Sequence, residues 1–192
     1  MKAIDGIGLK DVQAVYGGPE GRLWELIMGE QIHIGGFASS SDLAEKAGIA
    51  AGTRGVDLCC CTGAGTRFLV RFRGVQHMTG VDATPHVLAL GRHRCQEEGL
   101  DGRVEFVQAD VCQTPLPGGQ ADFVWGEDAW CYVTDKAALI AQAARLVHVV
   151  LVVHAVHGVL RQVREGESDG AVQRPARSGH RHEILMDAGR HL

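Results

Sequence analysis

One stretch decides the fold of this protein, Asp57-Leu58-Cys59-Cys60-Cys61-Thr62-Gly63-Ala64-Gly65. The apolar residues at 55–60 predict a short buried strand, and residues 67–73 are expected to form a helix. A turn of small residues between a strand and a helix lets backbone amides approach a ligand closely. The stretch therefore predicts a turn that cradles a nucleotide at the end of a buried strand.

Strands and helices are expected to alternate along the middle of the chain. Further strands are predicted at residues 78–82, 104–109, 121–125 and 149–153, and helices at 85–98 and 136–147. This alternation implies an α/β architecture with a mostly parallel sheet and right-handed crossovers. Ligands of such sheets bind at the carboxyl ends of the strands. The side chains that follow each strand are therefore the candidate site residues.

The residues before the first strand are expected to form a helical cap. Their apolar side chains recur at helical spacing, with an interruption at Gly17-Gly18-Pro19. Asp42 and Glu45 stand at the spacing of a capping box, which predicts a short helix that begins there and ends near Gly48. Three regions follow: an N-terminal helical cap at 1–54, a cofactor-binding core at 55–157, and an atypical Arg/His-rich tail at 158–192.

The composition is that of a soluble globular protein, with 45% hydrophobic and 22% charged residues. The formal net charge of −4 argues against a general nucleic-acid binder, because no basic field would replace phosphate counterions. The N-terminus lacks an apolar segment of signal-peptide length, and histidines interrupt the longest apolar stretch, residues 146–160. We expect a cytoplasmic protein with no membrane partner, whose six cysteines are free thiols.

The segment from 56 to 147 resembles the class I S-adenosylmethionine-dependent methyltransferases. The first motif of that family is an acid followed by a glycine-rich turn, which Asp57, Gly63 and Gly65 match. Further acids close the second predicted strand and follow the third, at Asp82 and Asp110. The resemblance implies a Rossmann-like methyltransferase sheet with S-adenosylmethionine as the cofactor.

The resemblance also implies a role for each acid. Asp57 would lie near the methionine ammonium of the cofactor, Asp82 would hold the ribose, and Asp110 would hold the adenine amino group. The complete set expected to bind the cofactor is Asp57, Cys59, Gly63, Gly65, Asp82, Ala83, Asp110 and Val111.

Residues 125–130, Trp-Gly-Glu-Asp-Ala-Trp, resemble the branch of the family that includes the sarcosine and dimethylglycine N-methyltransferases. Residues 32–36 are similar to the same branch. The likeness implies a small-molecule methyl acceptor, with an amine nitrogen favoured over carbon or oxygen. Glu127, Trp130 and Tyr132 are the expected acceptor-side residues, although core packing is an equal alternative for Trp130. No catalytic residue is assigned, and the candidates are Glu127 and His33.

Two cysteines depart from the family pattern, because Cys59 and Cys61 stand where glycine is usual. A cysteine at the first position is expected to be tolerated as a small residue. At Cys61, the Cβ and Sγ atoms would intrude where the backbone meets the ligand, and a positive φ would add strain. This departure predicts a weakened affinity for the cofactor.

The C-terminal sequence also departs from the pattern. From His148 onward the chain contains no lysine and no aromatic residue, and the family's usual Pro-Gly-Gly turn is absent. We hypothesise that residues from about 148 onward do not encode the family's C-terminal part, through truncation or a change of reading frame. An incomplete sheet edge would then favour association, for example as a homodimer.

Two other functional readings stay open. One is a catalytically impaired remnant that binds the cofactor weakly or not at all. The other is an NAD-dependent Rossmann protein, against which Phe68 stands where a G-x-G-x-x-G motif needs its third glycine. No metal site is expected, because consecutive cysteines of a strand point to opposite faces and the histidines of the tail match no closed four-ligand spacing.

Overall fold

The computed structural model describes residues 7–33, 35–147, 152–156 and 159–162. Its described strands form one six-stranded sheet in the order β3-β2-β1-β4-β5-β6. The strands are β1 (Arg54–Leu58), β2 (His77–Asp82), β3 (Val104–Gln108), β4 (Phe123–Glu127), β5 (Val152–Val156) and β6 (Val159–Gln162). All neighbouring pairs are parallel except β5 and β6. The expected Rossmann-like, mostly parallel sheet is therefore confirmed.

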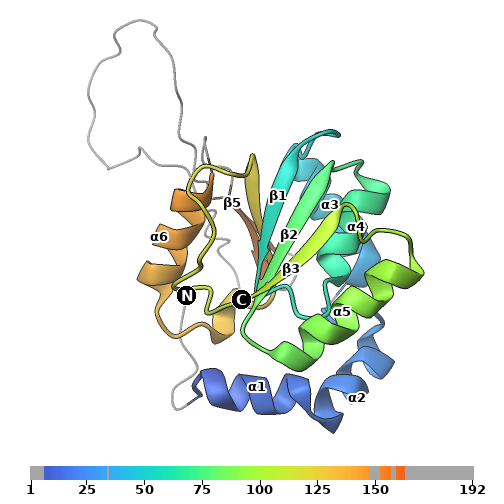
Figure 1. Ribbon diagram of the computed structural model, residues 1–192, viewed down its shortest axis with the longest axis vertical. Coiled ribbons are helices and arrows are strands. Elements are labelled where there is room, and N and C mark those ends of the chain that lie inside the picture. Colours follow the sequence, from blue (N-terminus) through green and yellow to red (C-terminus); the bar gives the residue numbers. More distant parts are fainter. Residues whose placement is uncertain (1–6, 34, 148–151, 157–158, 163–192) are drawn as a thin grey trace, which may run out of the picture.

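Helices cover both faces of the sheet (Figure 1). Helices α4 (Ala64–Phe72) and α5 (Pro85–Glu97) lie on one side, and α6 (Lys136–Leu146) lies on the other. Side chains of β4 alternate between the two layers, because Phe123 and Trp125 join the core beneath α4 while Val124 joins the core beneath α6. This alternation follows from the two-residue period of a strand, and it leaves both faces of the sheet buried.

Strand β4 lies two residues later than the sequence predicts. Ala121 forms an isolated bridge to Val147, and the side chain of Asp122 accepts a hydrogen bond of 2.7 Å from Arg54 N. Ala121 and Asp122, the first two residues of the predicted strand, are engaged in these contacts, so the ladder with β1 begins at Phe123. The shift puts Glu127 at the end of the strand, which is the position from which side chains reach a ligand.

Three helices precede the sheet, α1 (Leu9–Gly17), α2 (Pro19–Met28) and α3 (Gly36–Lys46). The break between the first two falls at Gly18, as expected. The prediction of a helix start at Asp42 is wrong, because α3 begins at Gly36 after Gly35 in the left-handed region. Asp42 lies inside the helix, and its carboxylate pairs with Lys46 at 2.7 Å, one turn later.

The sheet continues beyond β4. Strand β5 pairs with β4 in parallel register, and β6 turns back antiparallel to β5. Residues 149–151 of the predicted fifth strand, and residues 163–192 of the tail, lie outside the described residues. The hypothesis of a truncated or altered C-terminus stays a prediction. None of the helices in the described ranges has the length and apolarity needed to cross a bilayer.

Arg67 connects three parts of the fold from within the core. Its side chain is 3% exposed and donates to Thr62 O at 2.7 Å, to Glu98 at 2.9 Å and to Glu30 at 3.2 Å. These contacts join the turn after β1 to the end of α5 and to the segment after α2. Glu30 is two-thirds exposed, so we expect that arm to contribute little.

We expect Arg67→Met to lower the free energy of unfolding by about 2 kcal/mol, because the carbonyl of Thr62 loses its buried donor. Urea unfolding would measure the change. Arg71→Met is the matched control, since Arg71 pairs with the same Glu98 from a side chain that is 48% exposed. The control should cost less than about 1 kcal/mol. Equal losses in the two variants would contradict a special role for the buried guanidinium.

Candidate functional site

A cavity of about 760 Å³ lies at the carboxyl ends of β1 to β4. Residues that follow each of these strands line it, and residues of α1, α2 and the loop after α2 close it from the other side. This is where a parallel α/β sheet places its ligands. Of the eight residues expected to bind a cofactor, all but Gly63 line the cavity.

The turn after β1 carries backbone strain at both cysteines. Cys59 has φ 67° and Cys61 has φ 49°, so both lie in the left-handed region that favours glycine. The expectation of positive φ at Cys61 is met. The sequence did not indicate that Cys59 also takes a left-handed backbone, so strain is present at both cysteines.

Gly63 serves packing rather than the cavity wall. It stands at φ 72° before α4, and a Cβ atom there would come within 2.5 Å of the Phe106 ring. Only glycine can hold that position without moving the ring. The residue is needed for the turn, but not as a contact to whatever fills the cavity.

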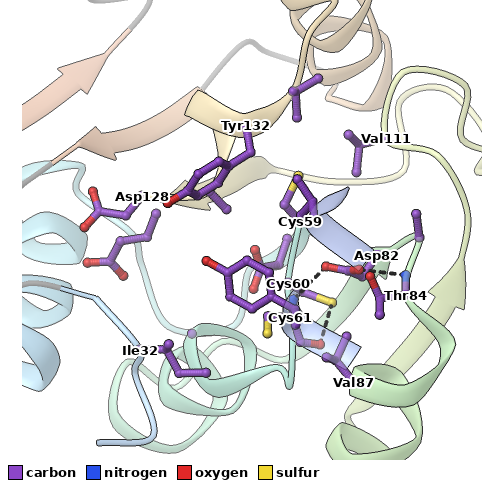
Figure 2. Close-up of a pocket in the computed structure, with 18 of the residues that line it drawn as sticks. Ile32, Cys59, Cys60, Cys61, Asp82, Thr84, Val87, Val111, Asp128 and Tyr132 are labelled. Atoms are coloured by element: carbon purple, nitrogen blue, oxygen red, sulfur yellow. Dashed lines mark hydrogen bonds between the residues drawn. The ribbon is translucent and has the colours of Figure 1, made fainter. Parts of the chain in front are cut away.

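The carboxylate of Asp82 fastens the turn to the neighbouring strand. One oxygen accepts Cys61 N–H at 3.0 Å, and the other accepts Thr84 N–H at 2.9 Å. Figure 2 shows these three residues together on one side of the cavity. Burial raises the pKa of Asp82, while the backbone donors lower it. Each oxygen keeps a second lone pair with which it could accept from a ligand.

Asp57 lies deeper in the same wall, on β1, and is 4% exposed. Its carboxylate accepts a hydrogen bond of 2.7 Å from the hydroxyl of Thr66 on α4. Burial raises the pKa of Asp57 to about 7, and the charge of Asp82 adds to the rise against the lowering effect of Thr66. A buried carboxylate of this kind is poised to receive a cation.

Two further predicted residues lie near the end of this wall. Asp110 accepts Cys112 N–H at 2.8 Å, which closes a tight turn after β3. The carbonyl of Ala83 accepts a hydrogen bond of 2.8 Å from the side chain of Gln13. That bond ties α1 to the loop after β2, so the N-terminal helices are anchored directly beside the cavity.

The opposite wall holds a buried polar cluster. Glu127, at the end of β4, accepts a hydrogen bond of 2.9 Å from the hydroxyl of Ser40 on α3. Ser40 Oγ also lies 3.1 Å from His33 Nε2, which is 3.3 Å from the other oxygen of Glu127. The structure thus brings the two predicted catalytic candidates together. Ser40 between them has no signal in the sequence, because it comes 87 positions before Glu127.

The two aromatic residues predicted for the acceptor side, Trp130 and Tyr132, lie in different environments. Tyr132 lines the cavity with Asp128 on the side opposite Asp82 (Figure 2). Trp130 does not line it, because its side chain is fully buried and its Nε1 donates to Leu58 O at 3.0 Å. A Cβ atom at Gly126 would lie 2.1 Å from that nitrogen, so glycine is required there. Trp130 is a core residue, and its expected place on the acceptor side is not supported by its position.

Tyr16 of α1 is an aromatic wall residue that sequence reasoning missed. Its ring meets that of Tyr132 edge to face, with 6.4 Å between the centroids. Burial raises the pKa of the Tyr16 phenol well above its usual value, so the hydroxyl stays neutral. The amphipathic spacing of α1 could identify a buried face, but not which partner that face meets.

The chain is similar in sequence to known methyltransferases. Residues 56–149 match the family described as a methyltransferase domain. A sterol 24-C-methyltransferase from Gibberella zeae is 27% identical over 104 residues, which cover 54% of this chain and 27% of the relative. The chain therefore spans about a quarter of that relative's length.

Solved structures are similar over more of the chain. A phosphoethanolamine N-methyltransferase of Haemonchus contortus, in complex with phosphomonomethylethanolamine and S-adenosylhomocysteine, has a TM-score of 0.69 at 23% identity. That match covers 85% of this chain and 38% of the other. A putative sarcosine dimethylglycine methyltransferase of Galdieria sulphuraria has a TM-score of 0.64 at 18% identity, over 72% and 59% of the two chains. At these identities the likeness is one of fold.

We expect the raised pKa of Asp57 to appear as pH-dependent stability. Folding raises the pKa of this carboxyl from 3.8 to about 7. Its contribution to stability is complete at a pH below the pKa of the unfolded chain, and it is lost as the pH rises through about 7. The free energy of unfolding should fall between about pH 5 and pH 7.5, and Asp57→Asn should reduce that fall. Urea unfolding across this range measures it. A wild-type curve that stays level, or an unchanged slope in the variant, would show that Asp57 is ionised throughout.

Proposed function

We propose that this chain, whose residues 56–149 match the family described as a methyltransferase domain, transfers a methyl group from S-adenosylmethionine to a small molecule. The single observation that carries the proposal is the cavity itself. It gathers Asp57, Asp82 and Asp110 in the order of strands that the motif series predicts. Its volume of about 760 Å³ is in the range of cofactor and small-molecule sites.

The cofactor wall fits S-adenosylmethionine in charge and in hydrogen bonding. Asp57 would hold the methionine ammonium, Asp82 the ribose hydroxyls and Asp110 the adenine amino group. Thr62 lines this wall, and its buried hydroxyl has no hydrogen-bond partner among the described residues. An orphaned donor of this kind costs free energy unless a ligand meets it.

Methyl transfer at this site depends mainly on the positioning of the two reactants. The cofactor supplies a methyl group already activated by a sulfonium, so no covalent enzyme intermediate is needed. The chain's own part is to align the acceptor nucleophile with that methyl and to exclude water. The N-terminal helices serve as a cap for this purpose, since Tyr16 and Trp24 line the cavity from their side.

The acceptor side favours an amine nitrogen. Glu127 and Tyr132 line it, and they combine a carboxylate with an aromatic ring, which is a typical setting for an ammonium-bearing molecule. The narrower resemblance to sarcosine and dimethylglycine methyltransferases supports the same class.

The second candidate function is a remnant with weak cofactor binding. Two features of Cys59 and Cys61 favour it. Their backbones are strained, and their side chains line the wall that the cofactor would contact, where glycine would leave more room. The two candidates differ in a single measurable property, which is the affinity for the cofactor product.

Calorimetric titration with S-adenosylhomocysteine tests this directly. We expect binding in the micromolar range at one site per chain, and loss of binding in Asp82→Ala because the ribose loses its acceptor. Asp101→Ala removes an exposed acid of the loop before β3 and should bind like the wild type. A folded wild-type chain that binds nothing would favour the remnant, and retained affinity in Asp82→Ala would remove the ribose role.

Replacing Cys61 should reveal what the substitution of glycine costs. We expect Cys61→Gly to tighten S-adenosylhomocysteine binding by roughly tenfold, or about 1.4 kcal/mol, since the Cβ and Sγ atoms leave the wall and the positive φ becomes unstrained. Cys95→Ala is the control, because it removes a buried thiol from α5 away from the cavity. If the two variants bind alike, Cys61 is not an obstacle.

A further inference from the structure

The cavity is lined by acids and by almost no basic groups. Among the described residues that line it, seven are Asp or Glu, none is Lys or Arg, and one, His33, is a histidine. Three of the acids, Asp57, Asp82 and Asp110, belong to the proposed cofactor wall. Glu127 and Asp128 lie on the acceptor side, so an acceptor that enters there meets negative charge.

One carboxylate oxygen of Glu127 makes no hydrogen bond among the described residues. Its side chain is 6% exposed. Oε2 accepts from Ser40, whereas Oε1 is buried and makes no hydrogen bond to the described residues, although His33 Nε2 lies 3.3 Å away. A buried carboxylate oxygen without a donor is costly, and a ligand N–H would remove that cost.

Ser40 and His33 hold the carboxylate in place from the N-terminal segment. The Ser40 hydroxyl donates to Glu127 Oε2, and the same oxygen lies within hydrogen-bond distance of His33 Nε2, at 3.1 Å. The side chain of His33 is 5% exposed; it extends from the loop before α3 to Ser40 of α3 and Glu127 at the end of β4. This chain of contacts fixes the direction in which Oε1 points.

Glu127 is also tuned as a proton acceptor. Burial raises the pKa of Glu127 to about 8. Hydrogen bonds from Ser40 and Ser39 lower it, and the charges of Asp128 and Asp57 raise it. His33 is the only basic side chain recorded as facing this carboxylate. A base whose pKa lies near neutrality is suited to take and later release a proton.

We infer that Glu127 binds the ammonium group of the methyl acceptor and takes its proton, with Ser40 and His33 as positioning residues, and that this acceptor carries no phosphate. The inference rests on the proposed methyltransferase function. Arg and Lys give phosphate its strongest side-chain contacts, and no lysine or arginine is found among the described residues of the cavity wall. The acceptor class thus differs from the phosphorylated amine bound by the Haemonchus enzyme.

The proposed proton transfer balances without a further reactant. The acceptor N–H bond breaks with its electron pair left on nitrogen, and the proton forms an O–H bond on Glu127. The nitrogen pair then forms the new N–CH₃ bond, while the pair of the broken S–CH₃ bond stays on sulfur. Glu127 finally returns its proton to solvent.

Ethanolamine and phosphoethanolamine are matched probes, because they differ only in the phosphate. Each is titrated into the full chain saturated with S-adenosylhomocysteine. We expect ethanolamine to bind at least tenfold more tightly at pH 8, and its affinity to rise at least tenfold between pH 6 and pH 8 as Glu127 ionises. Equal binding, tighter binding of the phosphate ester, or no ethanolamine binding overturns the inference.

Variants separate the roles in the cluster. Glu127→Gln should lose at least tenfold in ethanolamine affinity and should lose its pH dependence. Ser40→Ala should move the midpoint of that dependence to higher pH, since the lowering hydrogen bond is gone, and Ser40→Thr should restore it. Glu97→Gln, which removes an exposed charge of α5, is the control for net charge. Wild-type behaviour of Glu127→Gln would overturn the inference.

Binding of S-adenosylhomocysteine tests the proposed methyltransferase function independently of ethanolamine binding. A chain that binds S-adenosylhomocysteine but not ethanolamine refutes the ammonium site and leaves the methyltransferase proposal standing. A chain that binds no S-adenosylhomocysteine refutes the proposed function itself.

Discussion

The site is organised around the carboxylate of Asp82. It stands at the end of β2 and accepts backbone N–H groups from Cys61 and Thr84, so it joins the turn after β1 to the start of α5. The turn carries backbone strain, because Cys59 and Cys61 occupy left-handed positions that cost free energy. Two charge-assisted hydrogen bonds offset part of that cost. This link fixes the part of the cavity wall that the turn after β1 and the start of α5 share.

Buried negative charge is the second constraint. Asp57 and Glu127 lie in opposite walls, and burial raises the pKa of both toward or above neutrality. Neither has an arginine or lysine partner among the described contacts, so each is satisfied only partly, by a hydroxyl of Thr66 or Ser40. Such acids reduce the stability of the empty protein at neutral pH and favour the binding of positively charged groups. A sulfonium cofactor with an ammonium group, and an ammonium acceptor, have the matching charge.

The N-terminal helices complete the site instead of simply preceding the sheet. Gln13 of α1 bonds to the loop after β2, and the Glu25 carboxylate of α2 forms a two-pronged ion pair with Arg94 of α5. Helix α3 supplies Ser40 to the acceptor side. All three helices lie in the segment before β1. That one segment therefore both closes the cavity and orients Glu127.

The sequence by itself determined the alternation of strands and helices, the parallel sheet, and the acids at the strand ends, because periodicity and strand-end position are local properties. The four acids that it singled out, Asp57, Asp82, Asp110 and Glu127, line one cavity. Only the tertiary structure decided that α3 begins at Gly36, that Trp130 is a core residue, and that Tyr16 and Ser40 belong to the cavity and its cluster. These outcomes depend on contacts between distant positions, such as the bond from Ser40 to Glu127, and helical spacing tells which face is buried without telling what it meets.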